Sequence, residues 1–438
     1  MKFAAGSNKA RLHMLDMIPT EVETVPDGFK QTEIGLIPEE WSVVQLGDPN
    51  VARLIMGQSP TSDTYNTAGD GLPFFQGKAD FGSKYPTPSK WCSSPIRIAE
   101  PKDVLMSVRA PVGDVNLASA KSCIGRGLAA IRASIASDHE FLFYLLTHEK
   151  ERIEQQGSGT TFKSINKDVL KVLPISLPPL PEQRAIAHVL SKIQAAAETQ
   201  AKIAERAREL KRALMAKLFT EGLRGERLKE TEIGLMPEGW EVAPLGDCVT
   251  QAQYGLSVRG EESGKYPILR MTNQQNGDIV PANLQHVNIS ENELAKFKIN
   301  RGELLFNRTN SMELVGRTAI FDLEEDYVFA SYLIRVAVIR EKLEPHFLNF
   351  YLNDENSQAR LKGLATRGVS QSNISASRLR TFIIPVPPLD EQRKIARILQ
   401  TVDAKITSAE RKRAGLEELF RAMLGQLMTG RVRANSFD

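Results

Sequence analysis

The chain has 438 residues, of which 42% are hydrophobic and 25% are charged. This length exceeds what one ordinary hydrophobic core holds, and the composition is that of a folded protein, which excludes a disordered or fibrous chain. The formal net charge of +3 neither requires nor excludes a nucleic-acid partner, so local clusters of charge have to decide that question. We therefore expect two or more globular domains.

The cysteines and the hydropathy pattern indicate the compartment. Cys92, Cys123 and Cys248 are far apart and match no metal-ligand spacing, so we interpret them as reduced thiols. The first thirty residues contain no continuous apolar run, and no segment approaches the roughly 20 apolar residues of a membrane span. The sequence predicts a cytoplasmic protein with no membrane partner and no metal site.

Taken in chain order, the sequence is duplicated. The stretch "TEIGLIPEEWSVVQLGD" at 32–48 returns as "TEIGLMPEGWEVAPLGD" at 231–247, and "LPPLPEQRAIAHVL" at 177–190 returns as "VPPLDEQRKIARIL" at 386–399. The repeat distance is 199 residues for the first pair and 209 for the second, so the second half carries ten extra residues in its interior. The frames match while the interiors differ, which predicts two domains with one plan and different surfaces.

Each half reads as a mixed domain followed by a long helix. Short apolar runs such as "LPFF" and "YPILRM" between Gly, Pro and Asn residues predict strands and loops, and residues 140–154 look helical. The fold class we predict is α+β, with two mixed α/β domains. The predicted segments are an N-terminal extension (1–31), a first domain (32–180), a first long helix (181–221), a linker and second domain (222–389), a second long helix (390–430) and a C-terminal tail (431–438).

Both long helices have a start signal and an apolar stripe. A Pro-Pro pair gives an extended approach, and Pro181 or Asp390 then suits a first-turn or cap position. Of ten positions spaced three or four apart, nine are apolar in each copy, which is typical of amphipathic helices. The residues expected at the helix–helix interface are Ile186, Leu190, Ile193, Leu210, Leu214, Ile395, Leu399, Val402, Leu416 and Leu419.

A stripe of this length is too long for one compact domain to bury. The economical partner of each helix is the other copy, which predicts a long antiparallel two-helix coiled coil and an internal pseudo-two-fold repeat. The alternative is that each helix packs separately on its own domain.

In order and in duplicate, these phrases resemble the specificity subunit of type I restriction-modification systems. The resemblance covers nearly the whole chain from Thr32 and includes "MGQSP", "MSVRAPVG" and "CIGRGLAAIR" in the first domain. It implies two target-recognition domains that each read half of a split double-stranded DNA sequence, joined by a coiled coil. It further implies two methyltransferase subunits and restriction (motor-nuclease) subunits as partners in a defence system against foreign DNA. S-adenosylmethionine, ATP and Mg²⁺ would be used by those partners, and this chain would bind no cofactor.

Basic segments at matching places in the two halves agree with DNA binding. Residues 356–389 contain no acidic residue and five basic ones, and the matching stretch 157–180 has three lysines against one aspartate. Such loops suit phosphate contacts and base-edge contacts, and Arg109, which we place opposite Arg308, can read a base bidentately. Solvated loop charge is the alternative reading for any one of these residues. The candidate DNA-binding residues are Arg109, Arg126, Lys163, Lys167, Arg270, Asn307, Arg308, Arg317, Arg367, Gln371 and Asn373.

No catalytic motif is found. An "NPPY"-type loop for a flipped adenine is missing, residues 260–265 ("GEESGK") fall one residue short of a P-loop, and the six histidines form no metal pair. We therefore predict a non-catalytic subunit. The remaining alternative is a coiled-coil adaptor that joins proteins without reading DNA, which would not need basic loops in both domains.

Overall fold

The computed structural model describes residues 25–157, 164–368 and 371–434, and Lys163 lies outside the described residues. The chain divides into two compact units, one made of Met1–Ala196 with Gly415–Asp438 and the other of Ala197–Ala414. Both units contain one β-rich domain and parts of the same two long helices, α4 (Leu180–Glu221) and α9 (Leu389–Met428). The prediction of two mixed domains joined by long helices is confirmed.

The first domain is built on a four-stranded sheet in the order β10-β9-β12-β4 and a five-stranded sheet in the order β5-β7-β6-β11-β8. Hairpin β1–β2 and strand pair β3–β13 flank them. Its elements are β1 (Phe29–Thr32), β2 (Gly35–Pro38), β3 (Ser42–Gln45), β4 (Ala52–Met56), β5 (Tyr65–Asn66), β6 (Leu72–Phe75), β7 (Trp91–Cys92), β8 (Ile98–Ala99), β9 (Val104–Ser107), β10 (Val115–Leu117), β11 (Ser122–Ile124), β12 (Leu128–Ala133), α1 (His139–His148), α2 (Lys150–Gln155), α3 (Lys167–Val172) and β13 (Pro174–Leu177), with short 3₁₀ turns at Ser62–Thr64 and Lys78–Asp80.

The second domain follows the same plan with a six-stranded sheet in the order β17-β26-β22-β24-β20-β19. Two three-stranded sheets, β21-β18-β25 and β23-β28-β27, and the strand pairs β14–β15 and β16–β29 complete it. Its elements are β14 (Leu228–Thr231), β15 (Gly234–Pro237), β16 (Glu241–Pro244), β17 (Val249–Tyr254), β18 (Tyr266–Leu269), β19 (Gln274–Gln275), β20 (Asp278–Ile279), β21 (Gln285–Val287), α5 (Glu291–Phe297), β22 (Leu304–Asn307), β23 (Thr309–Asn310), β24 (Thr318–Ile320), β25 (Val328–Phe329), β26 (Leu333–Val338), α6 (Pro345–Asn353), α7 (Glu355–Gly363), β27 (Thr366–Arg367), β28 (Ser372–Asn373), α8 (Ala376–Arg380) and β29 (Ile383–Val386), with 3₁₀ turns at Leu245–Asp247 and Met271–Asn273.

The strand ladders of the two domains can be matched residue by residue. Leu105 of β9 pairs with Ala130 of β12, and at the same place Leu305 of β22 pairs with Arg335 of β26. The parallel pair β6–β11 recurs as β18–β25, with Phe75 next to Ile124 and Leu269 next to Phe329. These matches decide which side chains of the two domains occupy equivalent positions.

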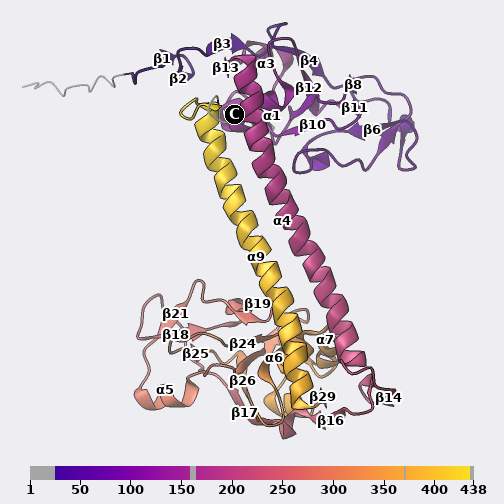
Figure 1. Cartoon of the computed structure of the whole chain (residues 1–438), viewed down its shortest axis with the longest axis vertical. Coiled ribbons are helices and arrows are strands. Elements are labelled where there is room, and N and C mark those ends of the chain that lie inside the picture. The colour runs from indigo at the N-terminus through magenta and orange to yellow at the C-terminus, as the bar shows by residue number, and fades with distance from the viewer. Residues whose placement is uncertain (1–24, 158–163, 369–370, 435–438) are drawn as a thin grey trace, which may run out of the picture. The chain divides into compact units, whose positions relative to one another are not determined.

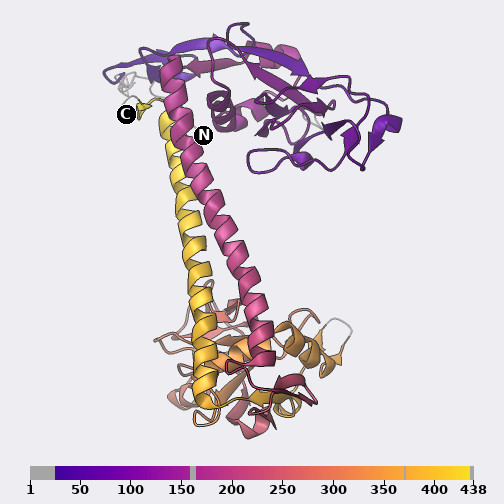
Figure 2. The ribbon, with the colours of Figure 1, turned by 45° about the vertical axis from the view of Figure 1, so that its right-hand side comes forward.

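The long helices pack against each other in opposite directions. In the first unit Leu424 and Leu427 of α9 join the core that contains Ile186 and Leu190 from the start of α4. In the second unit Met215 and Leu218 of α4 join the core that contains Ile395 and Leu399 from the start of α9. Figures 1 and 2 show the two helices side by side. The antiparallel pairing predicted from the duplicated stripe is confirmed.

The prediction that Leu210 and Leu419 are buried between the helices is wrong. They are 52% and 46% exposed, at the same position of the two repeats. Lys211 takes the inward position on α4 instead, where its ammonium pairs with Asp403 at 2.7 Å and lies 4.9 Å from the ring centroid of Phe350.

On α9 the inward position next to Leu419 belongs to Phe420, whose ring packs 5.8 Å from that of Tyr144. The buried stripe therefore moves around each helix more than a uniform spacing of three or four assumes. Val402 is buried with Ala207 and Ile406. Ile193, Leu214 and Leu416 are half-buried.

The duplicated phrases "PEQR" and "DEQR" fix the start of each long helix through a buried glutamine. Gln183 accepts a hydrogen bond from the backbone N–H of Asp138 at 2.8 Å, and Gln392 does the same for Glu344. Asp138 and Glu344 are the N-caps of α1 and α6. Each glutamine thus ties the beginning of a long helix to the beginning of a helix in its own domain, which explains why the phrase occurs twice.

The glutamate of each phrase is also buried and receives a distant arginine. Glu182 accepts the indole N–H of Trp41 at 2.9 Å and a bidentate contact from Arg433, which follows α9. Glu391 accepts the indole N–H of Trp240 at 3.3 Å and pairs with Arg224, which follows α4. In both units, therefore, an arginine that follows the end of one long helix binds a glutamate at the start of the other.

All three cysteines are free and buried, and burial beside Cys92 raises the pKa of the Cys123 thiol to about 12. Across the described ranges no helix has the length and apolarity to cross a membrane, and no group of three or more potential ligands is placed to hold a metal ion.

Candidate DNA interface

In the first domain three strand ends meet around an open pocket of about 200 Å³. Gln76 follows β6, Arg109 follows β9, and Arg126 lies in the turn between β11 and β12. A Cβ at Gly127 would lie 2.1 Å from the carbonyl oxygen of Gln76, so only glycine allows the start of β12 to pass this close to the end of β6. The close approach brings Gln76 and Arg126 to the same pocket.

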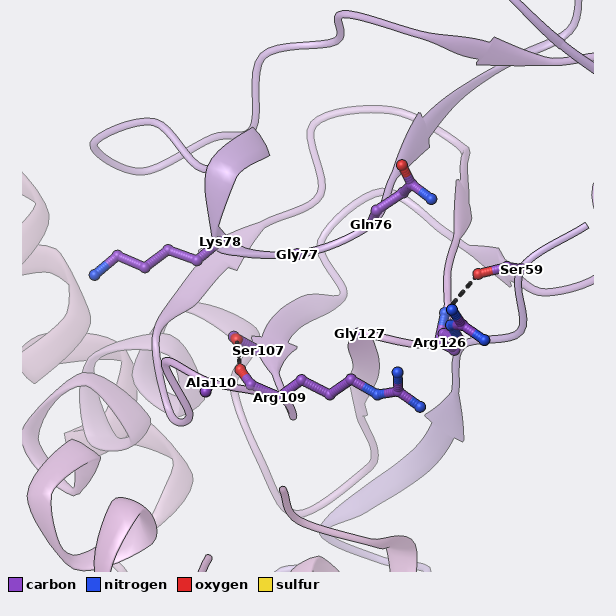
Figure 3. Close-up of a pocket in the computed structure, with 9 residues that line it drawn as sticks. All are labelled: Ser59, Gln76, Gly77, Lys78, Ser107, Arg109, Ala110, Arg126 and Gly127. Carbon is purple, nitrogen blue, oxygen red and sulfur yellow. Dashed lines mark hydrogen bonds between the residues drawn. The ribbon is translucent and has the colours of Figure 1, made fainter. Parts of the chain in front are cut away.

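The two arginines of this pocket have fixed backbones and available side chains. The N–H of Arg126 donates to Ser59 Oγ at 3.2 Å, and the hydroxyl of Ser107 lies 2.8 Å from the carbonyl oxygen of Arg109. Within the described ranges, neither guanidinium makes a hydrogen bond or an ion pair. Figure 3 shows both side chains extending toward the same side of the pocket. Lys78, on the same rim, is instead paired with Asp114 at 3.0 Å.

The equivalent region of the second domain has different side chains at every one of these positions. By the strand ladders, Arg270 replaces Gln76, Asn307 replaces Ser107, Thr309 replaces Arg109 and Ser331 replaces Arg126. Arg109 forms its β-bridge with Ser164, while Thr309 pairs with Asn373 in the matching place. The prediction that Arg109 lies opposite Arg308 is therefore wrong by one residue.

Arg308 is the centre of a small polar cluster in the second domain. Its guanidinium lies 4.4 Å from the ring centroid of Tyr254 and donates to Ser331 O at 3.3 Å and to Asn373 Oδ1 at 3.4 Å. Asn373 in turn donates to Thr309 Oγ1 at 2.7 Å. The structure thus brings the two candidates Arg308 and Asn373 together and adds Tyr254 and Thr309, which the sequence did not single out.

The other candidates of the second domain differ in accessibility. Asn307 is buried, and its side-chain oxygen has no partner among the residues described. Arg270 donates to Asn283 O at 2.9 Å, which fixes its guanidinium. Arg317 is exposed, as are Arg367 in β27 and Gln371 just before β28. In the first domain Lys167 is exposed at the start of α3.

The acid-free segment 356–389 is only partly available for a ligand. Arg360 binds the Tyr351 hydroxyl at 2.8 Å and Ile383 O at 2.7 Å, while Arg378 binds Leu364 O. Arg380 binds Gly246 O. These three arginines hold loops of the domain together, which leaves Lys362 and Arg367 as the basic groups of this segment without such a structural contact in the described chain.

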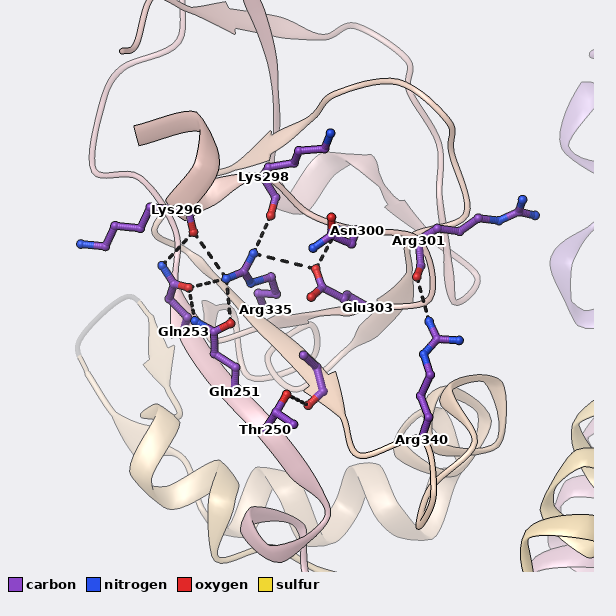
Figure 4. Close-up of polar contacts among 11 residues, drawn as sticks. Thr250, Gln251, Gln253, Lys296, Lys298, Asn300, Arg301, Glu303, Arg335 and Arg340 are labelled. Atoms are coloured by element: carbon purple, nitrogen blue, oxygen red, sulfur yellow. Dashed lines mark hydrogen bonds and ion pairs between the residues drawn. The ribbon is translucent and has the colours of Figure 1, made fainter. Parts of the chain in front are cut away.

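A further arginine of the second domain serves its interior. Arg335 is buried in the centre of the sheet and donates to the side-chain oxygens of Gln251 and Gln253 and to the backbone oxygen of Lys298 (Figure 4). Glu303 lies 3.9 Å away and supplies a compensating charge. Ala130 stands at this place in the first domain, so the buried arginine network belongs to the second domain's own core.

Sequence reasoning missed Gln76, Ser59, Tyr254, Thr309 and Ser331. One signal for Gln76 was present, because "LPFFQ" and "YPILR" end at matching places and Arg270 was already a candidate. The serines and Thr309 become visible only when the strand ladders bring separate loops together.

The chain thus has two domains with one frame, different polar groups at equivalent strand ends, and a pair of antiparallel helices. Residues 38–207 and 237–418 match the family model described as type I restriction modification DNA specificity domain. The chain belongs to this family: it is a type I restriction-modification specificity subunit, which recognises DNA target sites and is itself non-catalytic. This membership decides against the adaptor alternative.

Known relatives extend over most of the chain. The MjaVIII specificity subunit of Methanocaldococcus jannaschii is 25% identical over 94% of this chain and 97% of its own. The putative MjaX specificity subunit of the same organism is 45% identical, and that match spans about half of each chain, 50% and 51%. A crystal structure of the type I S subunit from M. genitalium superposes with a TM-score of 0.61 at 18% identity, covering 88% of this chain and 96% of that one, which shows the shared fold.

Proposed function

We propose that this specificity subunit reads a bipartite, asymmetric sequence in double-stranded DNA, with one half-site for each domain. The observation that carries the proposal is the exchange of polar groups at equivalent strand ends, where Arg109 and Arg126 of the first domain are replaced by Thr309 and Ser331 in the second. Equivalent frames present the two surfaces to DNA in the same way, while different side chains select different bases.

Phosphate contacts and base contacts have different candidate groups in this proposal. Basic residues such as Lys167 at the start of α3, the half-buried Lys362 in α7 and Arg367 in β27 suit phosphates, whose neutralisation supplies sequence-independent affinity. The strand-end clusters around Arg126 and Arg308 are more rigid and suit base edges. Lys163 falls outside the described residues and stays a candidate on sequence alone.

We further propose that two methyltransferase subunits, and restriction subunits where the system has them, assemble on this chain. Those partners use S-adenosylmethionine, ATP and Mg²⁺, and the chain works in the cytoplasm on DNA that enters the cell. The duplication of the long helices supports two copies of the same partner, because an internally repeated chain offers two equivalent binding places.

The experiment is to express the chain with its methyltransferase subunit in a host without other DNA methylation and to map the methylated adenines. An interrupted motif with two unlike halves is expected. A single uninterrupted motif would contradict the division between domains. In parallel, binding of the purified chain to random duplex should weaken steeply with salt, whereas an insensitive or absent interaction would speak against phosphate contacts.

A further inference from the structure

We infer that the first-domain pocket reads guanine, with Arg126 and Arg109 as its specificity-determining residues. This inference rests on the proposed function and assigns a base to one of its two half-sites. It concerns the pocket lined by Ser59, Gln76, Lys78, Ser107, Arg109 and Arg126.

The chemistry of the pocket is dominated by two uncommitted guanidinium groups. Each guanidinium presents several donors and no acceptor, and neither has a partner among the side chains or backbone groups that the structure describes. The nearby cations differ in this respect, since Lys78 and Lys150 both pair with Asp114, at 3.0 and 2.7 Å. The pocket therefore offers donor groups whose partners must come from a ligand.

Guanine is the base that best matches a group with donors only, such as either of these guanidinium groups. In the major groove guanine shows two adjacent acceptors, N7 and O6, and one arginine contacts both at once, while adenine and cytosine each present a donor there and thymine presents one acceptor beside its methyl group. An adenine-reading arginine would face the adenine amino group and leave one N–H unpaired. The amide of Gln76 on the same rim can donate and accept, so it suits a neighbouring adenine and does not compete for the guanine.

The backbone at both arginines is held in place by the surrounding residues. Arg126 lies between Gly125 and Gly127, and a Cβ at Gly125 would lie 3.2 Å from both the Phe74 ring and Ser59 Oγ, so the turn fits closely against its surroundings. Ser59 holds the N–H of Arg126, and Ser107 lies within hydrogen-bond distance of the carbonyl oxygens on both sides of the Arg109 turn, at Arg109 and Pro111. A fixed backbone lowers the entropy lost on binding and favours selection among bases over general attraction to phosphate.

The second domain lacks this arrangement. Thr309 and Ser331 stand where Arg109 and Arg126 stand, and its own Arg308 is stacked on Tyr254 with its guanidinium donating to Ser331 and Asn373. Guanine readout by two free arginines is thus specific to the first half-site.

The test uses the complete complex of the chain with its methyltransferase subunit. To locate the half-site read by the first domain, residues 38–177 are replaced with the equivalent part of a relative whose DNA target sequence is known. The half of the methylation motif that changes is the half read by the first domain. That half is expected to contain a guanine at a fixed position. If the wild-type complex methylates no sequence motif, that result would instead count against the proposed function itself.

Arg126→Ala and Arg109→Ala are then compared with Arg53→Ala, an exposed arginine on β4 outside the pocket. The ratio of binding to target DNA and to DNA with the guanine replaced should fall by roughly 5- to 150-fold in the pocket variants, while the Arg53 variant keeps the ratio. Arg126→Gln should move the preference toward adenine, because glutamine pairs with N6 and N7 of adenine.

Three results would overturn the inference. One is a first half-site without guanine, and another is an unchanged ratio in both pocket variants. The third is equal weakening on all sequences together with a smaller salt slope, which would make the arginines phosphate contacts. The melting temperature of each variant is measured as a control. A value equal to that of the wild type shows that a lower binding ratio does not result from unfolding.

Discussion

The guanidinium of Arg433 binds both carboxylate oxygens of Glu182, at 2.6 and 3.0 Å, across 251 residues of sequence. The equivalent pair joins Arg224 and Glu391, which lie 3.2 Å apart. In each case a residue just past the end of one long helix neutralises a buried glutamate at the start of the other. The antiparallel pair is therefore closed by the same ion pair in both units.

Replacing Arg433 with methionine should destabilise the first unit. It leaves the Glu182 carboxylate, which is 2% exposed, without its cation, and breaking a fully buried pair costs about 3–5 kcal/mol. We expect a smaller loss, because about a third of the Arg433 side chain is in solvent. Chemical denaturation measures it, with Arg431→Met as the control on an exposed arginine two residues away.

Restoring the balance of charge should recover part of that loss. The double variant Arg433→Met with Glu182→Gln removes the buried charge together with its partner and should be more stable than Arg433→Met alone. If Arg433→Met melts like the wild type, the ion pair does not stabilise the helix start.

Aspartate substitutions along the helices should separate the buried stripe from the outward leucines. Ile406→Asp places a charge among Ala207 and Val402 and should lower the free energy of unfolding by several kcal/mol, on the order of a buried unpaired charge. Leu210→Asp and Leu419→Asp should each change it by about 0.5 kcal/mol or less, because both side chains are exposed. Equal destabilisation by all three would show that the leucines are buried after all.

His346 should make the stability of the second unit depend on pH. A hydrogen bond to Glu344, with Asp322 and Asp278 nearby, raises the pKa of His346 above its usual value of about 6.5. A raised pKa in the folded state gives stability that is complete below the unfolded pKa and is lost as pH rises through the folded pKa. Denaturation at pH 6 and pH 8 should show this loss in the wild type and a smaller one in His346→Asn. An identical pH dependence in the two proteins would refute the assignment.

The sequence predicted the architecture well because the signals for it are local and repeated. The Pro-Pro pairs and the apolar stripe predicted helices at 181–221 and 390–430, and the structure has them at Leu180–Glu221 and Leu389–Met428. The prediction of burial was wrong at Leu210 and Leu419, because the buried face shifts gradually around each helix and a fixed spacing of three or four residues does not include that shift.

The site was harder to predict because it is assembled from separate strand ends. Gln76 and Arg126 are 50 residues apart and meet only through the close approach at Gly127, which no local pattern reveals. Charge alone also misleads, since Arg335 and Arg360 are as basic as Arg126 but hold the interior and the loops of their domain.

The claim that each domain reads its own half of the target is tested most directly by duplicating one domain. Residues 38–177 are replaced by residues 237–386, so that both positions carry the second domain while both helix starts and their glutamates are kept. Methylated adenines are then mapped in a host that expresses the chimera with the methyltransferase subunit. We predict that the asymmetric motif becomes an interrupted inverted repeat of the second half-site. A functional chimera that still modifies the original asymmetric motif would contradict the claim that each domain reads its own half of the target.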